Sequence, residues 1–298
     1  MNAINYRPAQ ATDLESIAQM IVEQNRHPDT HCIHSDTADD APGTLREMQR
    51  LHAEGGLRFV VATGGDQLLG ALGCELDEEL GRAWLRGPFV SATEPDWRSL
   101  SSTLFQELLD SLPASIHIFD GFLNIANERG NQFYQERGFK QLRLVHVYQA
   151  ASLVEPSTAL EPCDPLLPTQ TQSFIELHES VFPGTYATGQ RILDKLDDSH
   201  RVFTLSQGSQ LLGYVYVTFD EESGEGSIEF IGVRETERGK NLGRRLLMAA
   251  LRWLFEEKKA PLVMLVVNDN LTNARSLYES AGFQLKYTGV HSRKGGTS

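Results

Sequence analysis

The sequence predicts an α/β fold, with helices packed on a mixed α+β sheet, and predicts two copies of it in tandem. The tetrapeptide Gln-Leu-Leu-Gly at residues 67–70 recurs at 210–213, 143 residues later. The pattern Tyr-x-x-x-Gly-Phe that ends at residue 139 recurs with its end at 283, 144 residues later. Two matches in the same order at nearly the same offset indicate a duplicated domain. Strand and helix patterns alternate within each copy, which favours a sheet covered by helices.

A proline-rich segment separates the two copies. Residues 154–168 contain four prolines, which preclude a continuous helix or a central strand. We therefore expect a first domain over residues 1–152, a connector over 153–168 and a second domain over 169–298. Each domain then has an ordinary size.

The elements of the first half follow from periodicity and from turn residues. Asp13 is a plausible N-cap for the first helix. The expected elements, in order, are a strand at Tyr6–Arg7, a helix from Asp13, strands at 58–63, 68–76 and 83–90, a helix after Pro95, a strand near 115–123 and a helix over 127–137 before Gly138.

The second half repeats this order. Residues 262–267 form a continuous apolar run, the pattern of a strand covered on both faces. Gly282 is a typical helix stop. The expected elements are helices near 172–181 and 189–196, strands near 201–205, 211–219, 227–233 and 262–267, a helix over 272–281 and a last strand from Phe283.

The most informative segment is 233–247, where an alternating apolar strand runs into a basic turn that opens a helix. The first amides of such a helix lack partners within it, and the positive end of its dipole faces outward. Gly239 and Gly243 allow close approach of a ligand to the backbone. Arginines and a lysine add positive charge at 238, 240, 244 and 245. These features predict an anion site suited to a pyrophosphate.

Composition narrows the class of protein. The net charge of −13 argues against a protein that wraps nucleic acid, because neutralising phosphates needs a broad basic surface. No apolar run is long enough to span a bilayer, and the N-terminus lacks a signal-peptide pattern. The three cysteines have no ligand-like spacing, which favours a reduced, cytoplasmic setting. Three histidines and a cysteine lie close together over 27–34, but Pro28 disrupts a helical face there, so a polar loop is favoured and no metal is expected.

The second half resembles the GNAT superfamily of N-acetyltransferases. The match rests on Val233–Gly243, which follows the pattern V-x-x-x-x-R/Q-G-x-G-x-G/A, and on Ala274-x-x-Leu-Tyr-Glu-x-x-Gly-Phe283 after an upstream Asn270. In the first half the resemblance extends to the opening at residues 6–14 and to the pattern at 127–139. Two departures are present. Asn241 replaces the middle glycine, and Asn270 lies one residue farther from Ala274 than usual.

The resemblance implies acetyl-CoA as co-substrate and assigns residues to it. The backbone around Ile231 and Val233 would bind the pantetheine arm and the thioester carbonyl, where an amide would also stabilise an oxyanion. Asn270 and Tyr278 would complete the site. The pyrophosphate would be held by the turn, namely Arg238, Gly239, Lys240, Asn241, Leu242, Gly243 and Arg244.

Three side chains are candidates for the chemistry, each with a plain alternative. Tyr278 matches a family position that protonates the departing thiolate, or it is a core tyrosine. Glu229 would accept the proton of an amine, or it points to solvent or pairs with an arginine. Strand alternation places it on the same side as Ile231 and Val233. Tyr186 lies in a segment that lines the acceptor site in the family, or in an ordinary helix connection.

The first copy has lost the turn. The corresponding residues, 95–100, contain no glycine, and Trp97 and Leu100 are bulky where close approach is needed. We therefore expect a degenerate first domain that has lost tight cofactor binding.

The predicted function is acetyl transfer from acetyl-CoA to the amine of a small molecule or peptide by direct attack. The layout is similar to that of the mycothiol synthase-type tandem members of the superfamily. The rival is a non-catalytic acyl-CoA-binding module with a regulatory or scaffolding role. A P-loop enzyme is less favoured, because the turn lacks Gly-Lys-Ser/Thr. We expect a monomer or homodimer that binds neither nucleic acid nor membrane.

Overall fold

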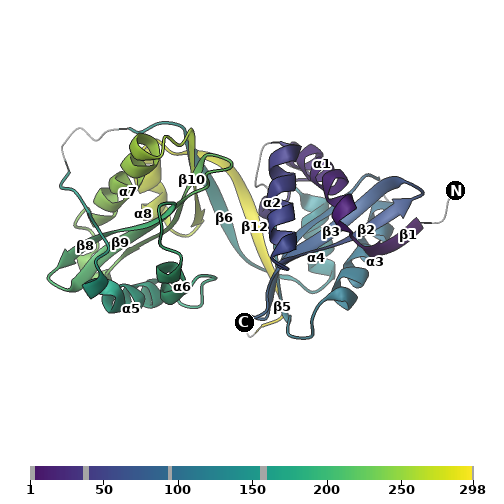
Figure 1. Cartoon of the computed structure of the whole chain (residues 1–298), viewed down its shortest axis with the longest axis horizontal. Helices are drawn as coiled ribbons and strands as arrows, with labels where there is room; N and C mark the ends of the chain where they lie inside the picture. The colour runs from purple at the N-terminus through teal and green to yellow at the C-terminus, as the bar shows by residue number, and fades with distance from the viewer. Residues whose placement is uncertain (1–3, 36–39, 93–95, 155–159, 297–298) are drawn as a thin grey trace. The chain divides into compact units, whose positions relative to one another are not determined.

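The computed structural model describes residues 4–35, 40–92, 96–154 and 160–296. The chain forms two compact units (Figure 1). Unit 1 comprises residues 1–145 together with 288–298, and unit 2 comprises residues 146–287. Each unit is a mixed sheet with helices, so the predicted α/β fold and its duplication are confirmed.

Unit 1 has the strand order β1-β2-β3-β4-β5-β12. Its neighbouring strands are antiparallel except for β4 and β5, which are parallel. The strands are β1 (Ile4–Pro8), β2 (Leu57–Gly64), β3 (Gln67–Asp77), β4 (Arg82–Val90), β5 (Ile118–Asn124) and the last part of β12 (Gln284–Lys294). The helices are α1 (Leu14–Asn25), α2 (Ala41–Ala53), α3 (Asp96–Ser111) and α4 (Glu128–Glu136).

Unit 2 repeats this plan. Strands β7 to β10 are antiparallel neighbours, and β10 runs parallel to β11. The strands are β6 (Lys140–Ala150, which begins in unit 1), β7 (Asp164–Pro165), β8 (His200–Gln207), β9 (Gln210–Phe219), β10 (Glu225–Val233) and β11 (Leu262–Asn268). The helices are α5 (Thr171–Val181), α6 (Gly189–Asp194), α7 (Leu242–Arg252), which continues into a π-helical turn at Trp253–Glu257, and α8 (Thr272–Ser280).

The two faces of the unit 2 sheet carry separate cores. Alternate residues of β9 point to opposite faces, as a pleated strand requires. Tyr214 and Tyr216 pack with Phe174 of α5, whereas Val215 and Val217 pack with the apolar side of α7. Helices α5 and α6 thus cover one face, and α7 covers the other.

Strands β10 and β11 separate partway along their length. They pair only where 225–228 of β10 face 262–265 of β11. Within the described part of the chain, the later β10 residues have no ladder partner on the β11 side. Strands β4 and β5 of unit 1 pair over only 82–84 and 118–120 in the same way. The separation leaves backbone groups without a ladder partner, and such groups need another partner from the protein, solvent or a ligand.

The compact units do not coincide with the expected domain ranges. Strand β12 begins in unit 2, and its residues 289–294 pair with β5 of unit 1. The expected ranges, 1–152 and 169–298, assign all of β12 to the second domain and stay a prediction about the duplicated copies. Residues 155–159 of the expected connector lie outside the described ranges.

Most expected elements are present. Helix α2 and strands β6 and β7 were not expected from the sequence. Asp13 occupies the N-cap position of α1 without capping it, because its carboxylate binds Arg7 (2.6 and 2.9 Å) and the amide of Gln10 (2.7 Å). No helix in the described ranges is both long and apolar enough to cross a membrane.

Candidate functional site

The turn before α7 is built from two residues in the left-handed conformation. Gly239 has φ +79°, and Asn241, the N-cap of α7, has φ 63°. Asparagine tolerates this region better than most residues, which explains how it replaces the glycine of the family pattern. The first hydrogen bond at the start of α7 runs from the amide of Arg245 to the carbonyl of Asn241 (3.3 Å). The amides of 239–244 donate to no group in the described part of the chain.

The basic side chains of this turn have different surroundings. Lys240 pairs with Glu237 (2.9 Å), and Arg245 pairs with Glu161 (3.1 Å). Arg245 is therefore directed to the segment before β7. Arg238 and Arg244 form no ion pair with a described residue. The turn thus combines unpaired amides with two uncommitted cations, a suitable arrangement for an anion.

The open edge of β10 leads to this turn. Beyond Ile228, the backbone groups of 229–233 on the β11 side have no ladder partner among the described residues. This stretch contains Ile231 and Val233, whose backbone the family resemblance assigns to the pantetheine arm. Along the chain, a strand edge is therefore followed by a helix N-terminus, and the backbone groups of both have no partner among the described residues.

A β-bulge lies in β10 at Glu229. The β9–β10 register shifts between Ile228, which faces Val217, and Phe230, which faces Tyr216. Ile228 packs in the core under α7, whereas Phe230 packs in the core under α5. A bulge inserts one residue and so breaks strand alternation locally.

The bulge corrects the expected orientation of Glu229. Strand alternation predicted that Glu229 shares a side with Ile231 and Val233, and this is wrong. Those two residues pack toward α7, while Glu229 contacts Tyr186 and Thr218 on the α5–α6 face. The physical reason is the inserted residue, which no period-two pattern reveals.

Tyr186 and Glu229 are in direct contact. The phenol donates a short hydrogen bond to Oε2 of Glu229, and Thr218 Oγ1 lies 3.5 Å from Oε1. Desolvation and the adjacent carboxylate raise the pKa of Tyr186 well above its usual value, so the phenol stays protonated as a donor. Glu229 is partly exposed and pairs with no arginine in the described ranges. The structure therefore joins the predicted base and the predicted substrate-binding residue.

Tyr278 lies on α8, beside the start of α7. Its neighbour Leu277 is in van der Waals range of a Cβ placed on Gly243 (3.4 Å). The Tyr278 ring packs edge-on against Phe283, with centroids 6.0 Å apart. Its hydroxyl has no partner in the described part of the chain, and burial raises its pKa to about 12. The ring is thus a packing group, while the hydroxyl is a free proton donor.

Asn270 is displaced by the extra residue before Ala274. It lies exposed in the turn after β11, and Leu271 takes the N-cap position of α8 without a side-chain cap. In unit 1, Asn127 caps α4 by accepting from the amide of Gly130 (2.9 Å). The assignment of Asn270 to cofactor binding stays a prediction.

In unit 1 a cation occupies the place of Glu229. Arg86 lies 143 residues before Glu229, is 1% exposed and is held between the carboxylates of Glu47 and Glu75. It donates to Glu75 (Nε, 3.0 Å) and to Glu47 (Nη2, 2.9 Å). Burial acts against ionisation of Glu75, yet Arg86 lowers the pKa of that carboxyl below its usual value. The unit 1 position that corresponds to the predicted base Glu229 therefore carries a positive charge in place of a negative one.

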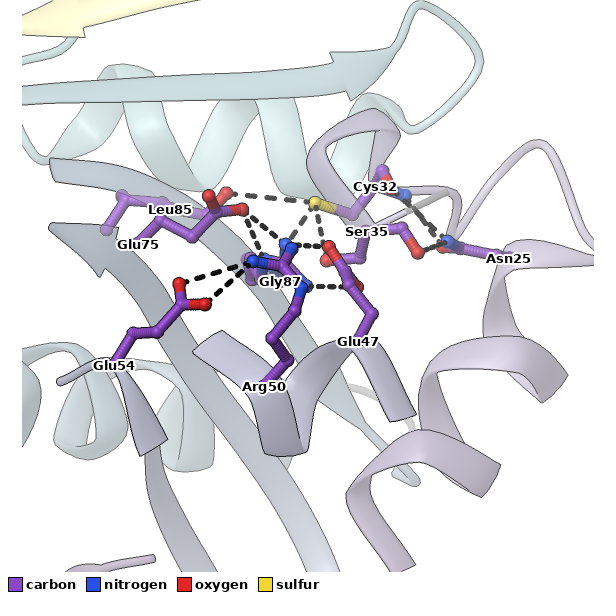
Figure 2. A network of polar contacts seen from close by, with 10 residues as sticks. Asn25, Cys32, Ser35, Glu47, Arg50, Glu54, Glu75, Leu85 and Gly87 are labelled. Atoms are coloured by element: carbon purple, nitrogen blue, oxygen red, sulfur yellow. Dashed lines mark hydrogen bonds and ion pairs between the residues drawn. The ribbon is translucent and has the colours of Figure 1, made fainter. Parts of the chain in front are cut away.

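Residues from outside strands β4 and β5 occupy the gap between these two strands of unit 1. Cys32 forms a β-bridge with Leu123 of β5, and its Sγ accepts from the amide of Gly87 on β4 (3.3 Å). Sγ also lies 3.9 Å from the carbonyl of Leu85 (Figure 2). The hydroxyl of Tyr134 donates to the carbonyl of Gly87. Backbone groups that are free on β10 are therefore occupied on β4.

The unit 1 residues that correspond to the basic turn of unit 2 also differ from it in their surroundings. Trp97 and Leu100 are buried, at 3% and 5% exposure, and belong to the core of unit 1. The Trp97 ring packs against Phe133, and Arg129 lies over it at 4.4 Å. Pro95 lies outside the described residues. Unit 1 has neither a glycine turn nor an open strand edge at these positions.

The histidine and cysteine segment at 27–34 does not gather metal ligands. Cys32 is buried, and desolvation raises the pKa of its thiol. His34 is largely buried and lies edge-on to Phe122, with centroids 5.8 Å apart. Among the described residues, no three histidine, cysteine or acidic side chains are placed to hold a metal ion.

One buried histidine near the site was missed from the sequence. His178 on α5 is fully buried and bonds both Tyr214 and the carbonyl of Ala187, next to Tyr186. The only sequence signal is a histidine on the apolar side of an amphipathic helix, which has no specific meaning by itself.

Comparisons with known proteins support the GNAT assignment. Residues 171–283 match the acetyltransferase (GNAT) family model. Over 85 residues the chain is 33% identical to mycothiol acetyltransferase from Salinispora tropica, a match that covers only 28% of each chain. The match thus spans less than a third of that relative's length.

Solved structures extend the likeness over the whole chain. A GCN5-related N-acetyltransferase from Sphaerobacter thermophilus has a TM-score of 0.73 at 18% identity, covering 98% of this chain and 95% of that one. A tandem GNAT protein from the clavulanic acid biosynthesis pathway has a TM-score of 0.62 at 14% identity, covering 99% and 100%. At these identities the structures show the fold alone, and this chain shares that fold with a tandem GNAT protein.

Proposed function

We propose that this tandem GNAT protein transfers an acetyl group from acetyl-CoA to an amine, and that unit 2 carries the reaction. The observation that supports this most is the pairing in one unit of an open β10 edge with a turn of unpaired amides at 239–244. The second expected domain, 169–298, contains both, whereas the first, 1–152, is proposed to be degenerate.

The turn fits the pyrophosphate of acetyl-CoA. A Cβ on Gly239 would meet nothing within 4 Å, so open space lies over that residue. The amides of 239–244 would bind phosphate oxygens, helped by the positive end of α7. Arg238 and Arg244 would add charge-assisted hydrogen bonds. The free backbone around Ile231 and Val233 would hold the pantetheine arm, and bound acetyl-CoA would supply the electrophilic thioester.

Glu229 would prepare the acceptor. An ammonium group must lose a proton before its nitrogen can attack a carbonyl, and a partly desolvated carboxylate can accept that proton directly or through water. Tyr186 would contact the acceptor and orient this carboxylate. Tyr278 would donate its phenolic proton to the departing thiolate, for which its free hydroxyl is suited.

The acceptor is proposed to be a small-molecule amine or a peptide. The strongly acidic composition favours a cationic partner over nucleic acid. A cytoplasmic location and a monomeric or homodimeric state complete the proposal. An acetyl-CoA consumption screen over amines, amino acids, polyamines, aminoglycosides and peptides tests the acceptor class.

The turn is tested by Gly243→Glu. A carboxylate here would repel phosphate and obstruct the approach to the turn, so acetyl-CoA affinity should fall at least about 100-fold in calorimetric titration. Gly56→Glu in unit 1, where a Cβ would lie at an ordinary contact distance from the carbonyl oxygen of Leu51 (3.8 Å), is the control and should bind normally. Unchanged affinity in Gly243→Glu would remove the assignment of the turn.

The rival function is a non-catalytic acyl-CoA-binding module. It predicts tight acetyl-CoA binding with no turnover on any acceptor. The enzyme proposal predicts turnover that falls about 100-fold or more in Glu229→Gln and about 10-fold or more in Tyr278→Phe, at nearly unchanged acetyl-CoA affinity.

A further inference from the structure

His178 lies at the centre of the core on the α5–α6 face of unit 2 and has 0% exposure. Four aromatic rings surround its imidazole, with centroid distances of 5.0 to 6.0 Å: Phe174, Phe182, Tyr214 and Phe230. In such apolar surroundings, both ring nitrogens need partners.

Both nitrogens of His178 have partners that fix its tautomer. Nε2 lies 2.7 Å from the carbonyl oxygen of Ala187, which can only accept, so Nε2 carries the hydrogen. Nδ1 lies 2.6 Å from the hydroxyl of Tyr214 and accepts from it. Burial lowers the pKa of His178, which favours this neutral form. The imidazole thus joins β9 of the sheet to the segment between α5 and α6.

The carbonyl that His178 holds is next to a site residue. Ala187 follows Tyr186, whose hydroxyl donates to Glu229. Tyr186 is 45% exposed, its ring lies against Phe230 with centroids 5.4 Å apart, and its own carbonyl accepts from Arg191 (3.4 Å). The position of its hydroxyl therefore depends on how the backbone of this segment is held. Farther along, the segment is held by the bond from the amide of Gly189 to Glu179 (2.9 Å).

We propose that His178 is a positioning residue that, by holding the carbonyl of Ala187, keeps the Tyr186 hydroxyl on the Glu229 carboxylate. The geometry is a continuous chain of contacts from Tyr214 through His178 and the backbone of Ala187 to Tyr186. This assignment rests on the proposed role of Glu229 in acyl transfer, but the contact it controls is observable without turnover.

The direct test follows the Tyr186 ring by NMR in the full chain, labelled with ¹³Cζ-tyrosine. The Tyr186 resonance is identified by its absence in Tyr186→Phe, and Glu229→Gln gives its position when the carboxylate is removed. In His178→Leu the resonance should move from the wild-type position toward that of Glu229→Gln. His178→Gln, which keeps a side-chain donor for Ala187, should retain most of the wild-type shift.

Two controls separate positioning from a packing defect. Phe174→Leu disturbs the same aromatic cluster without removing a hydrogen bond, and His31→Leu replaces a buried histidine of unit 1. Both should leave the Tyr186 resonance in place. A wild-type resonance in folded His178→Leu, or an equal movement in Phe174→Leu, would overturn the proposal. If His178→Leu does not fold, the His178→Gln variant decides. A Tyr186 resonance that moves in His178→Gln to the position seen in Glu229→Gln would contradict the proposal.

Kinetics give an independent readout. In the wild-type background, His178→Leu should lower kcat/KM for the acceptor about 10-fold. In a Tyr186→Phe background, the same substitution should lower it less than about 2-fold. The two losses should not add, because both residues act through the same contact. Additive losses would show that His178 does not act through Tyr186. An inactive wild-type protein would refute the proposed function alone, since the NMR test stands without turnover.

Discussion

Two tyrosines at matching positions of the two copies differ in what their hydroxyls do. Tyr134 is 1% exposed, and its hydroxyl is bonded to the carbonyl of Gly87. Tyr278, 144 residues later, packs edge-on against Phe283, where Tyr134 stacks on Phe139, and its hydroxyl has no partner among the described residues. The same residue type in the same motif therefore serves structure in unit 1 and is available for proton donation in unit 2.

At the residue scale, His34 should make stability depend on pH. Burial lowers its pKa from 6.5 to about 4, because the charged form is poorly solvated, with Glu75 partly opposing this and Arg86 adding to it. A group with a depressed basic pKa stabilises the fold fully above the unfolded value. That contribution is lost as pH falls from about 6.5 toward about 4, by on the order of 1–3 kcal/mol.

Urea unfolding at pH 4.5 and pH 7 measures this effect. His34→Gln should show a smaller loss of unfolding free energy between the two pH values than the wild-type protein. His27→Gln, an exposed histidine of the same segment, is the control and should follow the wild-type curve. Parallel curves for wild type and His34→Gln would contradict the prediction.

At the scale of elements, β10 shows what a sequence can and cannot predict. The strand, the glycine turn and the start of α7 follow from local rules, since alternation, turn residues and an amphipathic helix are all visible in 227–254. The bulge at Glu229 follows from the pairing with β9, which is not local. The sequence therefore predicts Glu229 as the candidate base, which stays a prediction, but it places this side chain on the wrong face of the sheet.

The same distinction applies to the contacts of the site. Tyr186 and Glu229 were separate hypotheses from the sequence, and only the fold brings them together. His178 was not singled out, because its role depends on a carbonyl nine residues away and on Tyr214 of another strand. Local patterns thus predicted the elements and most candidate residues, while tertiary contacts determined which of them act together.

The prediction at the scale of elements concerns Asn241, the N-cap residue of α7. Its left-handed conformation is costly for a residue with an ordinary Cβ, so Asn241→Ala should lose about 1 kcal/mol of unfolding free energy, whereas Asn241→Gly should change it little. Because the same conformation aligns the amides of the turn, Asn241→Ala should also weaken acetyl-CoA binding about 5–10-fold.

The matched control is Lys259, the other described non-glycine residue with positive φ, at 60°. Lysine already carries an ordinary Cβ, so Lys259→Ala should change the unfolding free energy little in urea titrations, whereas Lys259→Gly should raise it by about 1 kcal/mol. Both variants should leave calorimetric acetyl-CoA affinity unchanged. A change of affinity in Lys259→Gly as large as that in Asn241→Ala would mean that the turn conformation of Asn241 has no specific role in binding.

At the scale of the whole molecule, the two copies share one fold but differ in which of their backbone and side-chain groups already have partners. In unit 2 the β10 edge beyond Ile228 and the amides of the turn have no backbone partner among the described residues, and the carboxylate of the bulge residue Glu229 is bonded to Tyr186. In unit 1 the corresponding groups are occupied by Cys32, Tyr134 and the pair of carboxylates around Arg86. The last strand, β12, contributes residues 289–294 to the sheet of unit 1, so the first copy is completed by the end of the chain.

This comparison predicts one acetyl-CoA site per chain. Equilibrium dialysis of the wild-type protein should give a stoichiometry of about one, and Gly243→Glu should reduce it to about zero, because unit 1 has no free strand edge to replace the lost turn.

Tyr134→Phe frees the carbonyl of Gly87 and should cost about 1–3 kcal/mol of stability without adding a second site. A stoichiometry of two, or binding that persists near one in Gly243→Glu, would show that unit 1 retains a functional cofactor site despite its occupied strands.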